Sequence, residues 1–177
     1  TASIAGFQSP LIEYIIIVFM LLAGVNFTRH YRLFVELKPR SFFGDTEIKA
    51  YAFIVAVATG IVTISLVLHL GEGVPDSFRL SLFQVASIVT TTGFATADFE
   101  LWPPLPQVIL LALMLGGGCT GSSAGGLKIF RMTLLWKVVL REFKRMIEKR
   151  AVFVVRLGHQ VVPEATIQNL LNLLYLA

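Results

Sequence analysis

SFRLSLFQVASIV at residues 77–89, followed by TTTGF at residues 90–94, is the stretch that decides the fold. The first 13 residues form an apolar segment, shorter than the roughly 20 residues that a helix needs to cross a bilayer. Apolar stretches of about 10–14 residues are typical of buried or re-entrant helices. We expect Asp76 or Ser77 to cap this helix. The segment therefore predicts a helix that dips into a membrane and turns back.

Longer uncharged stretches surround this segment. Hydrophobic residues make up 55% of the 177 residues and charged residues only 15%, well below the quarter that is usual in soluble proteins. Residues 50–70 contain no charged side chain, and residues 11–27 are interrupted only by Glu13 and Asn26. A third apolar stretch begins near residue 105. Because backbone in lipid must satisfy its hydrogen bonds internally, we predict an all-α membrane protein.

The distribution of charge predicts the topology. Basic residues lie almost entirely within residues 28–49 and 128–164, with Arg79 as the exception. The positive-inside rule places those two segments in the cytoplasm and residues 71–104 outside. Topology thus explains the positive net charge, and we expect no nucleic-acid partner. Cys119 is the one cysteine and the three histidines lack ligand spacing, so we expect no cofactor besides a transported ion.

The turn after the short helix has the chemistry of a cation filter. A permeating cation loses water, and inward-facing carbonyl oxygens can replace it. A glycine tolerates the backbone angles that such a turn needs, and the negative end of the preceding helix favours a cation. The alternative is an ordinary external loop. We assign the filter to Thr90, Thr91, Thr92 and Gly93, with potassium held at the last three of these.

A glycine-rich segment interrupts the third apolar stretch. Six glycines within 11 residues disfavour a helix, and irregular backbone at membrane depth must pack in protein or line a cavity. A phosphate-binding loop is excluded because Leu127 separates Gly126 from Lys128. Close helix packing, a simple hinge and a movable gate remain open. The candidate gate residues are Gly116, Gly117, Gly118, Cys119, Thr120, Gly121, Ser122, Ser123, Ala124, Gly125 and Gly126.

The order of a crossing helix, SFRLSLFQVASIV, TTTGF and a crossing helix broken at GGGCTGSSAGGLK resembles the Trk/Ktr superfamily of potassium transporters. The resemblance implies a helix–re-entrant pore helix–helix repeat as in potassium channels, with a broken second helix. It further implies that the chain is a fragment of a longer protein that contains four such repeats. The implied divisions are the last helix of one repeat (1–28), a cytoplasmic connector (29–49), a complete repeat (50–140, with its broken helix at 105–140), a second connector (141–165) and the start of another helix (166–177).

The resemblance also implies a function without enzymatic chemistry. Residues 90–93 would supply one quarter of the filter and residues 116–126 would gate it from below, which gives potassium uptake. The implied surroundings are the lipid bilayer of the cell inner membrane, crossed several times. The implied partners are a second copy, giving a homodimer, and a cytosolic nucleotide-binding regulatory subunit. An ion-coupled secondary transporter with its site at the broken helix is the alternative.

Overall fold

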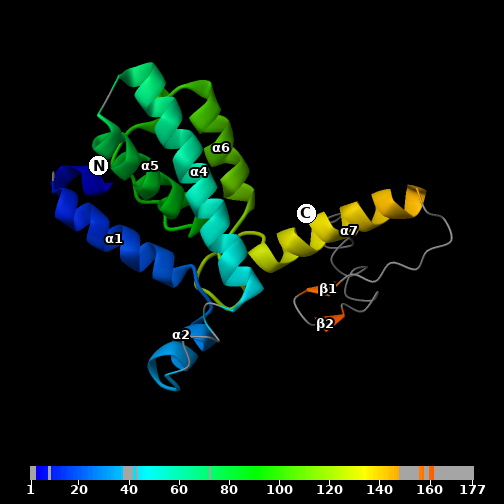
Figure 1. Cartoon of the computed structure of the whole chain (residues 1–177). Helices are drawn as coiled ribbons and strands as arrows, with labels where there is room; N and C mark the ends of the chain where they lie inside the picture. Colours follow the sequence, from blue (N-terminus) through cyan, green and yellow to red (C-terminus); the bar gives the residue numbers. More distant parts are fainter. Residues whose placement is uncertain are drawn as a thin grey trace.

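The computed structural model describes residues 3–7, 9–37, 42, 44–71, 73–147, 156–157 and 160–161. The regular elements of these parts are helices, apart from one two-stranded antiparallel ribbon (Figure 1). The elements are η1 (Ser3–Phe7), α1 (Pro10–Ala23), α2 (Phe27–Phe34), α4 (Thr46–Leu70), α5 (Val74–Val89), η2 (Phe99–Leu101), α6 (Pro104–Leu115), α7 (Ile129–Ile147), β1 (Arg156–Leu157) and β2 (Gln160–Val161).

Helix α4 is the longest apolar element. Among the described residues it alone is one continuous helix long and apolar enough to cross a membrane. It begins at Thr46, earlier than the expected residue 50, because the Asp45 side chain accepts a hydrogen bond from the Glu47 N–H (2.8 Å) and caps the first turn. It ends at Leu70, and the next residue, Gly71, caps it with a φ of 66° that suits a glycine. Both its buried and its exposed faces are apolar, as in a helix surrounded by protein and lipid.

The first expected span is shorter than the sequence suggested. Helix α1 ends at Ala23 rather than near residue 27, and the chain bends by 104° into α2. The bend forms because the Asn26 side chain accepts a hydrogen bond from the Thr28 N–H (2.8 Å) and starts a new helix. Asn26 had looked like a mere interruption of an apolar run, but it is the cap that redirects the chain.

The short helix α5 lies at the centre of the fold and packs against α1, α4 and α6. It begins at Val74, and Gly73 occupies the N-cap without a side-chain hydrogen bond. The expected cap at Asp76 or Ser77 is therefore wrong: Pro75 already fits the first turn, where its missing N–H costs nothing. Its second half is buried throughout, from Phe83 to Val89.

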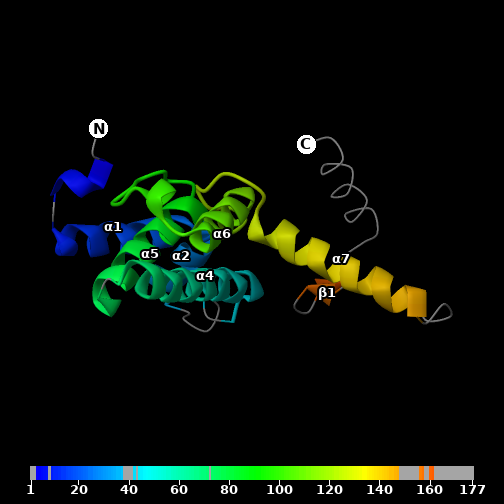
Figure 2. The ribbon, with the colours of Figure 1, turned by 90° about the horizontal axis from the view of Figure 1, so that it is seen from above.

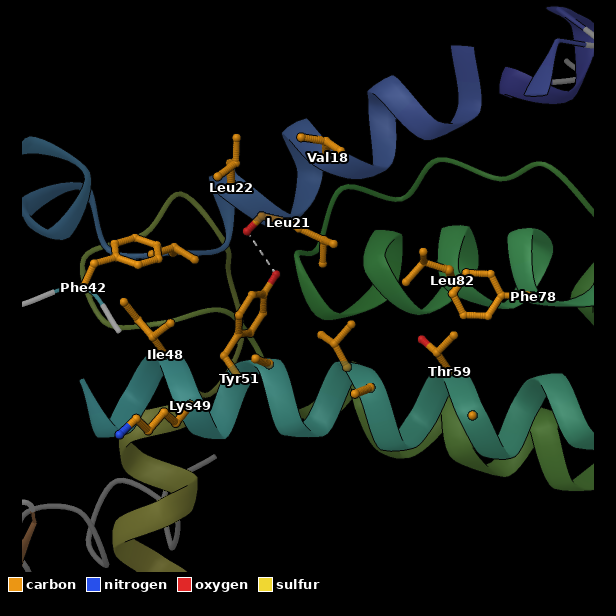
Figure 3. Close-up of a pocket in the computed structure, with 15 residues that line it drawn as sticks. Val18, Leu21, Leu22, Phe42, Ile48, Lys49, Tyr51, Thr59, Phe78 and Leu82 are labelled. Atoms are coloured by element: carbon orange, nitrogen blue, oxygen red, sulfur yellow. Dashed lines mark hydrogen bonds between the residues drawn. The ribbon is translucent and has the colours of Figure 1, made fainter. Parts of the chain in front are cut away.

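Helices α1 and α5 run in the same direction, opposite to α4. In Figure 3 the chain runs in the same direction from Val18 to Leu22 in α1 as from Phe78 to Leu82 in α5. It runs in the opposite direction from Ile48 to Thr59 in α4. Viewed from above, α5 is enclosed by its neighbours (Figure 2). The chain thus climbs through α4, turns at Gly71 and descends again through α5, so the filter sequence lies part-way along α4.

Helix α6 stops at Leu115, and helical structure resumes only at Ile129. Helix α7 then extends away from the other helices (Figure 1). In the described part of the second expected connector, Arg156–Leu157 pairs with Gln160–Val161. The expected start of another helix at residues 166–177 lies outside the described residues.

Candidate filter and gate

The end of α5 folds into a tight hydrogen-bonded turn. The Thr91 N–H donates to the Ile88 carbonyl (3.0 Å), and the Thr92 N–H donates to the Ser87 carbonyl (2.9 Å). This pair of bonds is the Schellman pattern, in which the residue after the helix adopts a left-handed conformation. The backbone N–H groups of the candidate filter are consequently turned towards the helix.

A threonine occupies the left-handed position of this turn, where glycine is usual. Thr91 has φ of 54°. A β-branched residue with positive φ is a genuine outlier, and such strain gathers at functional sites. Two residues later Gly93 has φ of 79°, a conformation that costs a glycine nothing. The backbone therefore changes direction twice within four residues.

Hydroxyl groups hold this turn from the side of α5. Ser87 Oγ donates to the Phe94 carbonyl (2.6 Å), and Thr90 Oγ1 donates to the Ala86 carbonyl (2.7 Å). The hydroxyls of Thr90 and Thr92 also share a hydrogen bond (2.7 Å). Thr90 is buried, whereas residues 91–94 are exposed. Within the described part of the chain, no donor reaches the carbonyl oxygens of residues 90–93.

The glycine-rich segment forms a closed loop rather than an open hinge. Its two ends meet where Gly116 and Leu127 pair in a parallel bridge and the Leu127 N–H donates to the Leu115 carbonyl (3.4 Å). The Ile129 N–H donates to the Gly118 carbonyl (3.2 Å). A side chain at Gly117 would clash with the Gly125 carbonyl. The glycines are therefore required where the two sides of the loop approach each other.

The loop is bound to the bend between α1 and α2. The Cys119 N–H donates to the Gly24 carbonyl (2.8 Å), and the Phe27 N–H donates to the Gly121 carbonyl (3.1 Å). Ser123 Oγ donates to the carbonyl of Ala23 (3.1 Å). Three hydrogen bonds thus join segments about a hundred residues apart in sequence.

Two charged side chains form hydrogen bonds with backbone groups of the loop. Glu47 Oε1 accepts hydrogen bonds from the Thr120 N–H (2.6 Å) and the Phe130 N–H (3.3 Å), so one carboxylate joins α4, the loop and the first turn of α7. Lys128 Nζ donates to the carbonyls of Ala124 and Ser122. Lys128 thus closes the loop by binding its carbonyl oxygens, a role that was not predicted from the sequence.

The loop contacts the candidate filter directly. The Gly125 N–H donates to Thr91 Oγ1 (2.7 Å). A Cβ built on Gly125 would lie 3.4 Å from the same oxygen, so the contact is close but leaves ordinary van der Waals space. The two segments that the sequence singled out separately therefore meet at Thr91.

A separate apolar cavity lies between α1, α4 and α5 (Figure 3). Its volume is about 680 Å³. Tyr51 crosses one end, where its hydroxyl donates to the Leu21 carbonyl (3.3 Å). The cavity does not include the filter or the loop, and no cluster of three or more metal-ligating side chains occurs within the described residues.

The sequence as a whole matches a family of transporters. The family model described as "TrkH: Cation transport protein" covers residues 1–176. The chain belongs to the TrkH family. This is a family of transporters and not of enzymes, as the sequence predicted, and the expected relation to the Trk/Ktr superfamily is confirmed.

Named relatives agree with this TrkH assignment. The chain is 36% identical over 169 residues to the Trk system potassium uptake protein TrkH of Vibrio parahaemolyticus, and 34% identical over 168 residues to that of Escherichia coli K12. Each comparison covers 94% of this chain and 35% of the relative. The Trk system potassium uptake protein TrkG of Escherichia coli K12 is 31% identical over 175 residues, with 98% of this chain and 36% of the relative covered. The chain thus spans about a third of the relatives that it matches.

The fold agrees with a solved member of the TrkH family. The crystal structure of the potassium transporter TrkH from Vibrio parahaemolyticus matches with a TM-score of 0.91 at 34% identity, covering 97% of this chain and 37% of that one. The predicted class, a helical membrane protein with a broken helix, is confirmed by this match.

Proposed function

We propose that this chain is part of a potassium uptake protein and supplies one segment of its selectivity filter, at Thr90, Thr91, Thr92 and Gly93. The names of the relatives support potassium as the ion. The chain spans about a third of the relatives that carry this name, so we assign the transport activity to a full-length protein and not to this chain alone.

The backbone at the end of α5 is the observation that carries the proposal. The N–H groups of Thr91 and Thr92 point back into the helix, residues 91–94 are exposed, and the carbonyl oxygens of residues 90–93 accept no hydrogen bond from the described residues. Such oxygens can replace the water around a potassium ion at Thr91, Thr92 and Gly93. The C-terminal end of α5 adds a partial negative charge behind them.

We assign the gate to the loop of residues 116–126. Its contact with Thr91 supports this role, because a loop seated against the filter blocks the path of an ion leaving it. The loop is held by hydrogen bonds to α4 and to the bend after α1, and Cys119 is its one member of the main apolar cluster among the described residues. Hydrogen bonds contribute about 1 kcal/mol each, so a few of them can hold a loop that still opens.

The filter is tested in the full-length protein, reconstituted in liposomes, by comparing potassium and sodium influx. Gly93→Ser is expected to lower the preference for potassium, because serine disfavours the φ of 79° at this position. Gly60→Ser is the matched control, since Gly60 lies in α4 with open space around it. An unchanged potassium preference in Gly93→Ser would refute the filter.

The gate is tested by deleting residues 118–124 in the same preparation. Removal of the loop is expected to raise basal flux of both ions while keeping their ratio. Lost flux with an altered coupling to protons or sodium would instead support the secondary transporter, in which the broken helix binds the ion.

We place the full protein in the cell inner membrane as a multi-pass homodimer that binds a cytosolic nucleotide-binding subunit. Helix α7 supports a cytosolic contact, because Lys137, Arg141 and Lys144 recur on it at helical spacing. Replacing all three with glutamate is expected to abolish co-purification with the regulatory subunit while leaving the membrane amount of the transporter unchanged.

A further inference from the structure

A buried ion pair joins α1 to the pore helix α5. Arg79 Nη1 lies 3.1 Å from Glu13 Oε2, and Arg79 Nη2 lies 3.0 Å from Asp76 Oδ1. The exposed fraction of the side chain is 8% for Glu13 and 67% for Asp76. Solvent weakens the pair with Asp76, whereas the pair with Glu13 is largely shielded. Glu13 is therefore the dominant partner of Arg79.

The pair begins a regular seam between two parallel helices. Glu13, Ile17 and Met20 of α1 are buried at helical spacing, and Ile17 and Met20 form one apolar cluster with Phe83 and Ala86 of α5. Arg79, Phe83 and Ala86 repeat the same spacing on α5. Because the spacing is equal, residues of the two helices can meet at matching levels along the seam.

The seam ends at the filter. One turn beyond Met20 lies Gly24, and one turn beyond Ala86 lies Thr90. A Cβ on Gly24 would lie 3.0 Å from Thr90 Cγ2, so these two residues are in close contact. The Gly24 carbonyl also binds the Cys119 N–H of the loop. Sliding of α5 along α1 would therefore move the filter against both Gly24 and the loop.

We propose that Glu13 and Arg79 form a positioning pair that sets the height of α5 along α1 and thereby the geometry of the filter. The apolar contacts in the seam resist separation of the helices but tolerate sliding, because they are non-directional. The opposite charges of Glu13 and Arg79 lie 3.1 Å apart, and their attraction weakens as the distance grows, so the pair resists sliding. A buried charge that loses its partner is strongly unfavourable, so the pair holds one register. This proposal rests on the proposed filter function.

The test measures potassium and sodium influx of the full-length protein in liposomes. Glu13→Gln keeps the size of the side chain and removes its charge, and Arg79→Met does the same on α5. Each is expected to lower the ratio of potassium to sodium influx by at least about fivefold, because coupling between two linked sites changes an affinity by about that factor or more. The exchanged double variant, Glu13→Arg with Arg79→Glu, is expected to restore most of the preference. Glu100→Gln is the matched control, because Glu100 is exposed and lies outside the seam.

The outcomes separate this proposal from the filter itself. A preference lowered by the single variants and restored by the exchange supports the positioning pair. Single variants with the wild-type preference, or an exchanged variant that is no better than they are or fails to accumulate in the membrane, would overturn it. If Gly93→Ser also leaves the potassium preference unchanged, the filter proposal fails. If Gly93→Ser lowers the preference but the Glu13 and Arg79 variants do not, only the positioning pair fails.

Discussion

Thr91→Val removes the hydrogen bond between the loop and the filter and changes little else. Valine has nearly the shape of threonine and the same branched Cβ, so the strain at φ of 54° stays. What is lost is the acceptor for the Gly125 N–H. Gly125 is exposed, so water can replace that acceptor when the loop leaves. The variant therefore destabilises only the seated loop.

The size of this effect follows from the single bond. A neutral hydrogen bond contributes about 0.5–1.5 kcal/mol net. Since about 1.4 kcal/mol is a factor of ten, the equilibrium should shift towards the open loop by roughly two- to tenfold. If the wild-type loop is mostly seated, basal potassium flux rises by the same factor. Thr91→Ser keeps the hydroxyl and is the matched control, expected to stay near the wild-type flux.

The assay is potassium influx into liposomes without any regulatory subunit, with sodium influx measured in parallel. A gating change scales both fluxes alike, whereas damage to the filter changes their ratio. The reasoning is refuted if Thr91→Val has the wild-type flux, or if Thr91→Ser rises as much as Thr91→Val. In the second case the methyl group and not the hydroxyl holds the loop.

Three further changes probe the same assembly. Gly93→Ala adds a Cβ into open space but at φ of 79°, so it should cost about 1–2 kcal/mol of backbone strain and alter the ratio of potassium to sodium influx without lowering the membrane amount. Glu47→Gln weakens two hydrogen bonds to backbone N–H groups, and basal influx should rise severalfold at an unchanged ion ratio. Gly24→Ala places a Cβ 2.5 Å from the Tyr51 hydroxyl and should cost about 1–3 kcal/mol, read as a lower melting temperature in detergent that Tyr51→Phe partly restores.

Patterns of apolar length and glycine content were sufficient to predict the main elements. The short helix α5 was predicted because 13 apolar residues are too few to cross a membrane, and the helix break was predicted because six glycines within 11 residues disfavour a helix. Both signals are local in sequence. The starts of α4 and α5 were misplaced by a few residues, because the cap at Asp45 and the proline at residue 75 outweighed the apolar pattern.

The partners of the candidate site could not be predicted from the sequence. Glu47 and Glu13 are single carboxylates near apolar runs, and nothing local shows that one reaches the loop at Thr120 and the other reaches Arg79. Those contacts depend on how distant helices pack. Arg79 did carry a signal, since it was the basic residue that broke the charge pattern on its side of the membrane. When a charged residue does not fit the charge pattern of the predicted topology, a buried side chain of opposite charge is the partner to search for.

The arrangement of these contacts constrains how the loop can move. Glu47 is fixed in the first turn of α4 and binds both the loop at Thr120 and the start of α7 at Phe130. A displacement of α7 away from α4 must therefore break the Phe130 hydrogen bond or pull Glu47 from the loop. On its other side the loop is bound at Gly24, next to the filter residue Thr90. Force applied to α7 would thus reach the loop before it reaches Thr90, as the proposed gate requires if it is to open without disturbing the proposed filter.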